Sequence, residues 1–264
     1  DGPPNGSQEV AETMIETVTS RQNSLLTRIV RLQNSKKFRR EQGLFVGDGT
    51  KLLEEAIRWD PQGLRAVVLQ EGIPCPQLPD HVRAVQVPRA LMENVSQMEA
   101  PEGALFVSAM PEQKETEIRR GCLVLDGIQD PGNLGTILRT ADALDVPVVL
   151  SEGCCDPYNA KTVRATMGAI FRTTPGYLSR QALFDQCRDE NIPLLATALS
   201  QQAKDIRRQD LRQAAVVIGS EGQGVSRQLL EASQGQLIIP MHPRCESLNA
   251  SVAAAIVLWQ MTGL

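Results

Sequence analysis

LDGIQDPGNLGTILRTADAL, residues 125–144, joins the end of an apolar run to a helix through a stretch rich in Gly and Pro. From Ile137 to Leu144 apolar residues recur about every 3.6 positions, which predicts a helix over 136–144. We expect a tight loop before this helix and Arg139 on its first exposed turns. A loop that opens such a helix after a strand is a candidate site.

Similar strand-like runs recur along the second half of the chain, and each is followed by a helical or turn segment. They are CLVLDG, VPVVLSEG, IPLLATAL, AVVIGSEG and QLIIPM. Such runs are typical of the buried strands of a parallel sheet. The pattern predicts an α/β domain whose mostly parallel sheet carries helices on both faces.

The first half of the chain predicts a smaller α/β unit. Helical segments DGTKLLEEAIRW and PRALMENVSQM alternate with the strand-like runs LRAVVLQ, VRAVQV and GALFVSAM. We place this unit at 14–110, a polar linker at 111–120 and the larger domain at 121–264. Residues 1–13 lack an apolar pattern and precede Met14, so we expect a flexible or vector-derived lead.

The composition limits the class of protein. Of the 264 residues 42% are hydrophobic, which is enough to bury a core. No stretch is long and apolar enough to span a membrane and no secretory signal opens the chain, so we expect a cytoplasmic protein. The six Cys form no CxxC pair and the only His are His81 and His242, which argues against zinc and against a His-based triad. We expect reduced thiols and no metal.

Positive charge is concentrated near the start of the chain, although the formal net charge is -4. The block RQNSLLTRIVRLQNSKKFRR, residues 21–40, holds seven Lys or Arg and no acid. Such a block can neutralise several phosphates of a nucleic acid. A solvated helix face explains it equally well, and the sequence leaves both interpretations open.

Three strand ends carry unusual residues, and open parallel sheets bind ligands where their strands end. They are LDGIQDPGNLGTILR, VVIGSEGQGVS at 216–226 and IIPMHPRCESLNASVAAAIVLW at 238–259. Glycines in the second segment let a ligand approach the backbone closely. The chain has neither a GxGxxG fingerprint nor the GK[ST] of a phosphate-binding loop, so a nicotinamide or nucleoside triphosphate site has no positive support.

Taken together, NLGTILRTADAL, IGSEGQGVS and IPM…SLNASVAAAI resemble the three motifs of the SpoU (TrmH-like) branch of the SPOUT superfamily. These proteins are RNA ribose 2'-O-methyltransferases that use S-adenosylmethionine. The resemblance covers about residues 118–264, and KFRREQGLFVGDGTKLLEEAI is similar to the family's small RNA-binding domain, with FVGDG where an acidic EG pair is usual. It implies a C-terminal trefoil knot, a homodimer, and methylation of rRNA or tRNA, with rRNA favoured.

The resemblance also implies which residues contact S-adenosylmethionine, mostly through backbone groups that read the adenine edge. They are Thr197, Leu199, Gly219, Ile239, Met241, Ser247 and Leu248. Apolar side chains among them would cover the faces of the ring. Ile239 and Leu248 are equally well explained as core residues, and a backbone contact is compatible with that role.

A second set matches the family's catalytic positions: Asn133, Arg139, Glu221, Ser247 and Asn249. An Arg stays protonated, so we expect Arg139 to grip a phosphate and stabilise the developing alkoxide, while the phosphate or solvent takes the proton. A surface ion pair with Asp142 or Asp126 is the alternative for Arg139.

The other catalytic positions also have simpler explanations. We expect Asn133 in a tight loop, where it could bond its own backbone, and Ser247 and Asn249 at the start of the last helix, where they could act only as caps. His242, Arg244 and Cys245 stand where the family more often has small residues.

The last helix, SLNASVAAAIVLWQM, is apolar on nearly all sides, so we expect it to be buried everywhere, partly by a second copy of the chain. Two rival functions remain. One is an RNA-binding protein with this fold that no longer methylates, and the matching catalytic set argues against it. The other is a dinucleotide-binding enzyme, whose Gly-rich first turn is missing near the first strands.

Overall fold

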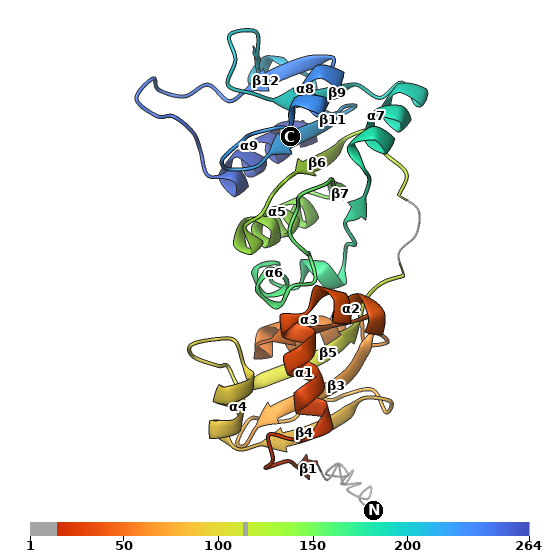
Figure 1. The fold of residues 1–264 in the computed structure, drawn as a ribbon, viewed down its shortest axis with the longest axis vertical. Coiled ribbons are helices and arrows are strands. Elements are labelled where there is room, and N and C mark those ends of the chain that lie inside the picture. Colours follow the sequence, from red (N-terminus) through yellow and green to blue (C-terminus); the bar gives the residue numbers. More distant parts are fainter. Residues whose placement is uncertain (1–14, 113–115, 264) are drawn as a thin grey trace, which may run out of the picture.

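The computed structural model describes residues 15–112 and 116–263, which form two β-sheets that follow one another along the long axis of the molecule (Figure 1). The lead predicted at 1–13 lies outside the described residues, as does part of the predicted linker. Within the described residues no helix is long and apolar enough to cross a membrane.

The N-terminal sheet is mixed and has the strand order β1-β4-β3-β5-β2. β4 runs parallel to β1 and β3, whereas β5 is antiparallel to β3 and β2. Its apolar positions alternate, so one sheet face packs on α1 and α4 and the other on α3. The elements are β1 (Glu16–Thr17), α1 (Ser24–Asn34), α2 (Lys36–Gln42), β2 (Leu44–Asp48), α3 (Thr50–Trp59), β3 (Leu64–Gln70), β4 (Arg83–Val87), α4 (Arg89–Val95) and β5 (Ala104–Ala109).

The C-terminal sheet is parallel throughout, in the order β10-β12-β9-β11-β6-β7-β8. Its first elements are β6 (Cys122–Asp126), α5 (Pro131–Ala143), β7 (Val148–Leu150), α6 (Ala160–Ala165), the short 3-10 helix η1 (Ala169–Phe171), β8 (Gly176–Tyr177) and α7 (Arg180–Asp189). The others are β9 (Leu194–Thr197), β10 (Lys204–Asp205), η2 (Ile206–Arg208), β11 (Ala215–Gly219), α8 (Arg227–Ala232), β12 (Gly235–Ile238) and α9 (Ala250–Thr262).

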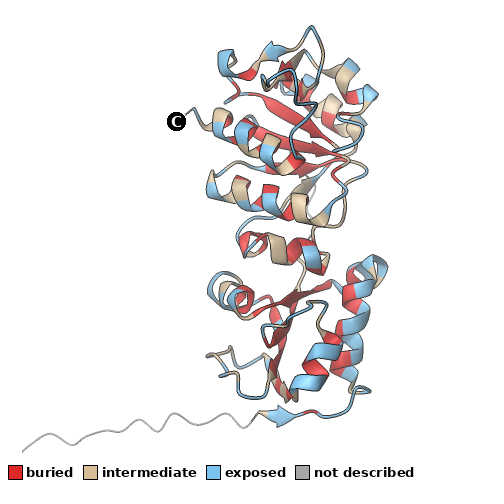
Figure 2. Cartoon of the chain, turned by 90° about the vertical axis from the view of Figure 1, so that its left-hand side faces the viewer, coloured by how far each residue is buried: buried red, intermediate tan, exposed pale blue. Residues whose placement is uncertain are grey.

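Both faces of this parallel sheet are covered by helices, as the sequence predicts. Leu123 and Leu125 of β6 pack in one core with α5 and α9, while Cys122 and Val124 pack in a second core with α7 and α8. Figure 2 shows the buried strands between helices whose outer surfaces are exposed. A strand buried on both faces has no polar alternation, and this explains the continuous apolar runs in the sequence.

The first motif differs from its prediction. α5 begins at Pro131 rather than at Thr136, so the stretch rich in Gly and Pro forms the first helical turns and not a loop. Asp130 caps the helix by accepting a hydrogen bond from the backbone N–H of Asn133 at 2.8 Å. Pro at the first helical position costs no backbone hydrogen bond. Gly135 has a packing role, because a Cβ there would press on Ala165 of α6.

The start of the last helix also differs. α9 begins at Ala250, and Asn249 caps it by accepting from the backbone N–H groups of Ser251 and Val252. Asn249 therefore has the predicted capping position. Ser247, expected to begin the helix, lies in the exposed loop that precedes it.

One chain buries only part of α9, and the predicted burial of the rest by a second copy stays a prediction. Ala254 and Leu258 are fully buried against the sheet and α5, whereas Val252 is 48%, Ile256 37% and Trp259 56% exposed. The sequence shows that the helix is apolar around its circumference, and the described chain covers one face of it.

The two domains share an apolar contact and a buried ion pair. α6 and η1 pack on the N-terminal sheet, where the ring of Phe45 lies 5.2 Å from Tyr158 and 5.9 Å from Phe171 between centroids. Beside these rings the Arg39 guanidinium donates to Asp156 Oδ2 at 2.7 Å, and their side chains are only 4% and 11% exposed. These contacts fix the N-terminal domain against α6.

Candidate active site

The three predicted motifs meet at the carboxyl ends of the parallel strands. β6 and β11 are neighbours, with Asp126 opposite Gly219 in register, and β9 lies between β11 and β12. The segments that leave these strands emerge at one edge of the sheet. Open parallel sheets bind ligands at such an edge.

A chain of side-chain hydrogen bonds links the three motifs. Asn133 Nδ2 donates to Glu221 Oε1 at 2.6 Å, and Asn133 Oδ1 accepts from Asn249 Nδ2 at 3.1 Å. The Asn133 amide therefore donates from its nitrogen and accepts at its oxygen. Because the Glu221 carboxylate can only accept, the amide nitrogen must face Glu221, and this determines the orientation of the Asn133 amide. The structure brings together three of the residues predicted to be catalytic. Ser247 is exposed in the loop before α9 and takes no part in this chain of hydrogen bonds.

The second motif is a tight turn at the end of β11. Ser220 and Gly224 exchange two backbone hydrogen bonds of 3.0 and 3.1 Å. A Cβ on Gly219 would overlap the backbone of Gly224, so the turn closes only over a glycine. This turn carries the exposed side chain of Glu221 toward α5.

Asp126, the last residue of β6, binds the backbone at the end of the second motif. It is 2% exposed, and its carboxylate accepts from the backbone N–H of Ser226 at 2.7 Å and from Arg180 Nη2 at 2.8 Å. A buried carboxylate is tolerated when it is paired and hydrogen-bonded in this way. Asp126 therefore fixes the second motif to the strand that precedes the first.

The residues predicted to contact the cofactor lie at the same edge. Thr197 ends β9 and donates its hydroxyl to the Val217 carbonyl at 3.0 Å. Leu199 is 68% and Leu248 37% exposed, and Ile239 is partly buried against the core. Exposed apolar side chains at such an edge offer a surface for the faces of a flat ring. The other members are Gly219 at the end of β11 and Met241 and Ser247 in the loop between β12 and α9.

Arg139 lies further along α5, on its exposed side, and lines a cleft of about 620 Å³ between the domains. The alternative ion pairs are not formed, because Asp142 pairs with Arg172 and Asp126 with Arg180, each at 2.8 Å. Across residues 15–112 and 116–263, no carboxylate lies within ion-pair distance of Arg139. Its charge is available to a ligand.

The same cleft contains a buried acid from the N-terminal domain. Asp48 ends β2 and is 2% exposed, and burial raises the pKa of its carboxyl. The Ser96 hydroxyl, which donates to Asp48 Oδ2 at 2.7 Å, and the nearby charge of Arg164 oppose this increase in pKa. Asp48 is the acid of the FVGDG stretch.

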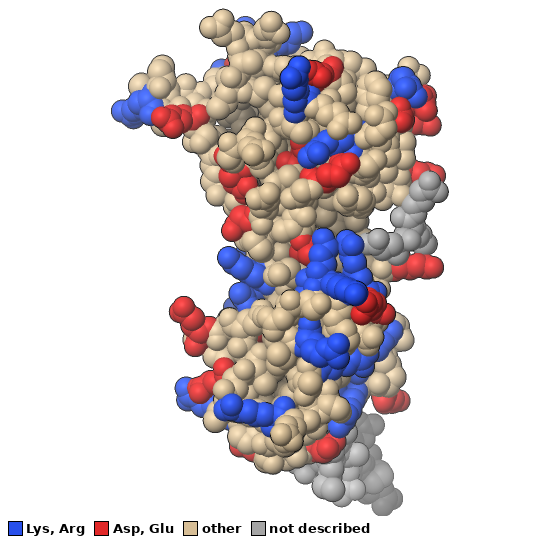
Figure 3. All heavy atoms as spheres, viewed as in Figure 1, with Lys and Arg blue, Asp and Glu red and all other residues tan. Residues whose placement is uncertain are grey.

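The predicted basic block occupies α1 and α2, and Figure 3 shows Lys and Arg gathered over these helices. Arg39 is structural, because it is buried against Asp156. The other cations of the block are exposed: Arg21, Arg28, Arg31, Lys36, Lys37 and Arg40. Neither interpretation anticipated the buried position of Arg39, and the six exposed cations are compatible with both.

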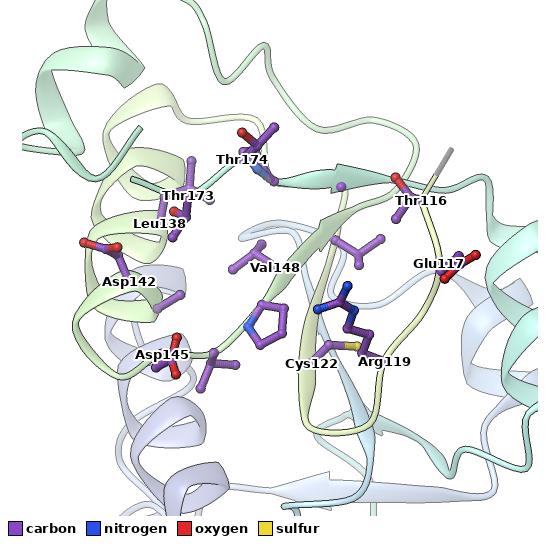
Figure 4. A pocket seen from close by; sticks show the side chains of 16 residues that line it. Thr116, Glu117, Arg119, Cys122, Leu138, Asp142, Asp145, Val148, Thr173 and Thr174 are labelled. Carbon is purple, nitrogen blue, oxygen red and sulfur yellow. The ribbon is translucent and has the colours of Figure 1, made fainter. Parts of the chain in front are cut away.

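A separate hollow of about 520 Å³ lies at the amino ends of the strands, opposite the edge described above (Figure 4). Asp142 and Asp145 line it from the end of α5, and Glu117 and Arg119 line it from the segment before β6. None of the predicted site residues borders this hollow. Of the two cavities, the cleft between the domains is the one that contains Arg139.

Two family models match the chain. Residues 121–259 match the SpoU rRNA Methylase family, and residues 23–105 match the MRM3-like substrate binding domain. The first match covers more than half of the chain. The chain belongs to the SpoU rRNA methylase family. This confirms the resemblance read from the three motifs and the more divergent N-terminal segment.

Similar proteins match this SpoU-family chain over nearly its whole length. The 23S rRNA (guanosine(2553)-2'-O)-methyltransferase RlmP of Bacillus subtilis is 32% identical over 87% of this chain and 93% of its own. A crystal structure of an RNA 2'-O ribose methyltransferase is 30% identical, covers 93% of this chain and 97% of its own, and has a TM-score of 0.78. The AdoMet-bound rRNA methyltransferase from Sinorhizobium meliloti is 26% identical, covers 94% and 97%, and has a TM-score of 0.80.

The contribution of the N-terminal domain and α6 to this region was not predicted from the sequence. Trp59 at the end of α3 and Arg164 of α6 line the same cleft as Arg139. A single Trp or Arg in an ordinary helix has no distinctive spacing. The available signal was Arg58 next to Trp59, with Lys51 about two helical turns earlier, since cations beside an aromatic ring are typical of nucleic-acid surfaces.

Proposed function

We propose that this chain transfers a methyl group from S-adenosylmethionine to a ribose 2'-oxygen of RNA. The observation that carries the proposal is the hydrogen-bonded set of Asn133, Glu221 and Asn249, which joins all three family motifs at one edge of the sheet. The likeness to RNA 2'-O-methyltransferases over both domains supports it.

The residues at this edge fit S-adenosylmethionine. Gly219 leaves room for close backbone packing, and Leu199, Ile239 and Leu248 supply apolar surface for an adenine ring. Thr197, Met241 and Ser247 complete the proposed contact set. The bound cofactor supplies a methyl group already activated by its sulfonium, so the reaction requires no metal. A relative of this chain is described with AdoMet bound.

The chain's own residues orient the ribose and stabilise charge. In this proposal Arg139 holds a phosphate next to the target nucleotide and stabilises the 2'-oxygen as it loses its proton to that phosphate or to solvent. S-adenosylmethionine held at this edge would supply the methyl group to that oxygen. Asn133, Glu221 and Asn249 hold the motifs in register, and Ser247 of the loop before α9 completes the proposed catalytic set.

We infer that the N-terminal domain contributes the RNA-binding surface. It carries exposed cations on α1 and α2 and matches a substrate-binding domain. Ribosomal RNA is the favoured substrate over tRNA, because the RlmP relative acts on 23S rRNA. The boundaries 14–110, 111–120 and 121–264, a cytoplasmic location, the C-terminal knot and a homodimer through the exposed face of α9 belong to the same proposal.

Labelled S-adenosylmethionine and total RNA from a deletion strain test the reaction. We expect label to enter RNA in the presence of EDTA. A 2'-O-methyl removes the hydroxyl that cleaves the adjacent phosphodiester in alkali, so the label should emerge in an uncleaved dinucleotide. Label in mononucleotides would indicate base methylation and would overturn the ribose assignment. Mapping the 2'-O-methyls lost in that strain would identify the nucleotide.

Calorimetry separates the proposed enzyme from the two rival functions. We expect the purified chain to bind S-adenosylmethionine and not NADH. Binding of NADH alone would favour the dinucleotide enzyme. RNA binding without either cofactor binding or methyl transfer would favour an RNA-binding protein that has lost the reaction.

A further inference from the structure

The cleft between the domains is built by helices of both. α3 forms one wall, and α5, α6 and the turn after α6 form the other, around about 620 Å³. Cavities of this size take ligands as large as a nucleotide. Arg139 lines this cleft, so a group that enters it comes to lie beside the proposed catalytic residue.

Two arginines of the cleft form no ion pair among the described residues, although the charge of Arg164 acts on the nearby Asp48 carboxyl. Within the part of the chain that the structure describes, the guanidinium groups of Arg139 and Arg164 form no ion pair or hydrogen bond, whereas Arg172 pairs with both Glu55 and Asp142. Nη1 of Arg164 is buried and has no hydrogen-bond partner within residues 15–112 and 116–263. Buried hydrogen-bond donors in proteins are normally paired, because an unpaired one costs free energy. A hydrogen-bond acceptor that enters the cleft could pair with Nη1 of Arg164 and remove this cost.

Two large apolar side chains line the same cleft, and the ring of one of them, Trp59, lies 5.1 Å from the Arg58 guanidinium and 5.6 Å from that of Arg172. Trp59 is 49% and Met167 47% exposed. Met167 also has a φ of 48°, a conformation that is costly for a bulky residue and is concentrated at functional sites. Large exposed apolar side chains next to unpaired cations suit a ligand with a flat ring and a negative charge.

We propose that this cleft binds one nucleotide of the RNA, with its phosphate between Arg139 and Arg164 and its base against Trp59. The inference rests on the proposed function and extends it, because it makes α3 and α6 part of the substrate site. Arg164 is then a positioning residue, which holds the phosphate so that Arg139 can act at the ribose. The base contact is tolerant of sequence, since every base has a π-face.

The acids that line the cleft are matched in number by its cations. Glu55 and Asp142 share Arg172, so one positive charge offsets one of their two negative charges. Glu102 accepts from the backbone N–H of Thr50 at 3.1 Å, and Asp48 is buried. Exposed Glu54 is balanced by the exposed cations Lys51 and Arg58.

Arg164→Gln tests the phosphate contact, with Lys161→Gln as its matched control. Lys161 is an exposed cation of the same helix that does not line the cleft. Binding of a short single-stranded oligoadenylate should weaken in Arg164→Gln, and the log-log salt slope should fall by about 0.7, the value for one single-strand phosphate contact. Lys161→Gln should keep the parent slope, and Arg164→Lys should keep the slope with weaker binding.

Trp59 provides an independent readout. The chain has two Trp, so Trp259→Phe leaves Trp59 as the only indole, and oligoadenylate should quench its fluorescence. Trp59→Ala should weaken oligoadenylate binding by about tenfold, and Trp59→Phe should recover most of it, because stacking needs only an aromatic face.

Distinct results separate this inference from its alternatives. If Arg164 served only to balance the Asp48 carboxylate, Arg164→Gln would lower the unfolding temperature and leave the salt slope unchanged, which would overturn the phosphate contact. Unquenched Trp59 with bound oligoadenylate would overturn the base contact. If the parent chain methylates RNA but these binding tests fail, the cleft inference is wrong and the proposed reaction stands. If the binding tests succeed but no methyl group is transferred, the proposed reaction is wrong and the cleft inference stands.

Discussion

Asn133 of the first motif donates its side-chain N–H to Glu221 of the second at 2.6 Å. The two residues are 88 positions apart in the chain, and both are at the carboxyl edge of neighbouring strands. The other end of the same amide accepts from Asn249 at 3.1 Å. One side chain therefore holds the other two motifs, and it can do so in a single orientation.

Asn133→Ala should keep the fold and reduce kcat/KM for methyl transfer by roughly tenfold or more, because two hydrogen bonds to charged or polar partners are lost at once. Asn133→Asp should be worse near neutral pH, since it sets a second carboxylate against Glu221. One shared proton relieves that repulsion, so the activity of Asn133→Asp relative to the parent should rise toward about pH 5.

The control for this pair is Asn94→Ala, which removes an exposed Asn of α4 that bonds only within its own helix. It should match the parent in activity at each pH. A flat ratio of Asn133→Asp to parent activity across the pH range would contradict the proposed contact between the two side chains.

Arg139→Ala should retain the parent's unfolding temperature, because the side chain is exposed and has no ion pair in the described chain. Methyl transfer should fall by roughly a hundredfold, the size expected for the loss of one well-placed charge. Arg139→Lys should rescue poorly, since a point charge does not replace the planar fork. Single-turnover rates with saturating cofactor measure the effect.

Arg227→Ala is the matched control, because Arg227 is an exposed Arg on α8 that pairs with Glu231 one turn away. Its rate should equal the parent's. Near-normal turnover in Arg139→Ala would remove Arg139 from the catalytic set.

The sequence predicts the parallel sheet because a strand that is buried on both faces has apolar residues at successive positions. Every residue of β6 and of β11 is buried, so both read as continuous apolar runs, broken in β6 only by Asp126 at its end. The start of α5 was harder to predict, because Pro and Gly usually end helices. Pro131 is at the one helical position where it costs nothing, and Gly135 is retained for its contact with α6.

The cleft could not be predicted from local sequence. Asp142 pairs with Arg172, which lies 30 positions further on, and this leaves Arg139 without an acid. Arg164 and Trp59 come from different domains and share the cleft only after the chain has folded. Periodicity and capping report neighbours along one element, whereas such contacts depend on how two elements pack.

Arg39→Met should destabilise the fold by about 3–5 kcal/mol, because it leaves Asp156 buried without its cation. The two side chains are 4% and 11% exposed, and Arg39 also donates to the Leu32 carbonyl at 2.6 Å. Chemical unfolding of Arg89→Met, which breaks an exposed pair with Glu93, should show less than about 1 kcal/mol of change. Equal losses for the two variants would show that the Arg39 pair contributes no more than a surface one.

Thiol labelling should follow burial. Burial raises the pKa of Cys155 and Cys187 to about 11, so at about pH 8 roughly one thiol in a thousand is the reactive thiolate. Iodoacetamide should therefore label the exposed Cys75 and Cys245 first, and Cys155 and Cys187 should react mainly after unfolding. Mass spectrometry of timed digests measures the order, and rapid labelling of Cys187 in the folded chain would contradict its burial.

Trp259→Glu should convert a dimer into a monomer. Val252, Ile256 and Trp259 are 48%, 37% and 56% exposed and recur along one face of α9, so the chain presents an apolar stripe that a second copy can bury. A carboxylate in the centre of such an interface would be desolvated without a partner. Val30→Glu places the same charge on a residue of α1 that is 39% exposed and should leave the assembly unchanged. Sedimentation velocity distinguishes the two, and a parent chain that sediments as a monomer over a wide concentration range would refute the proposed dimer.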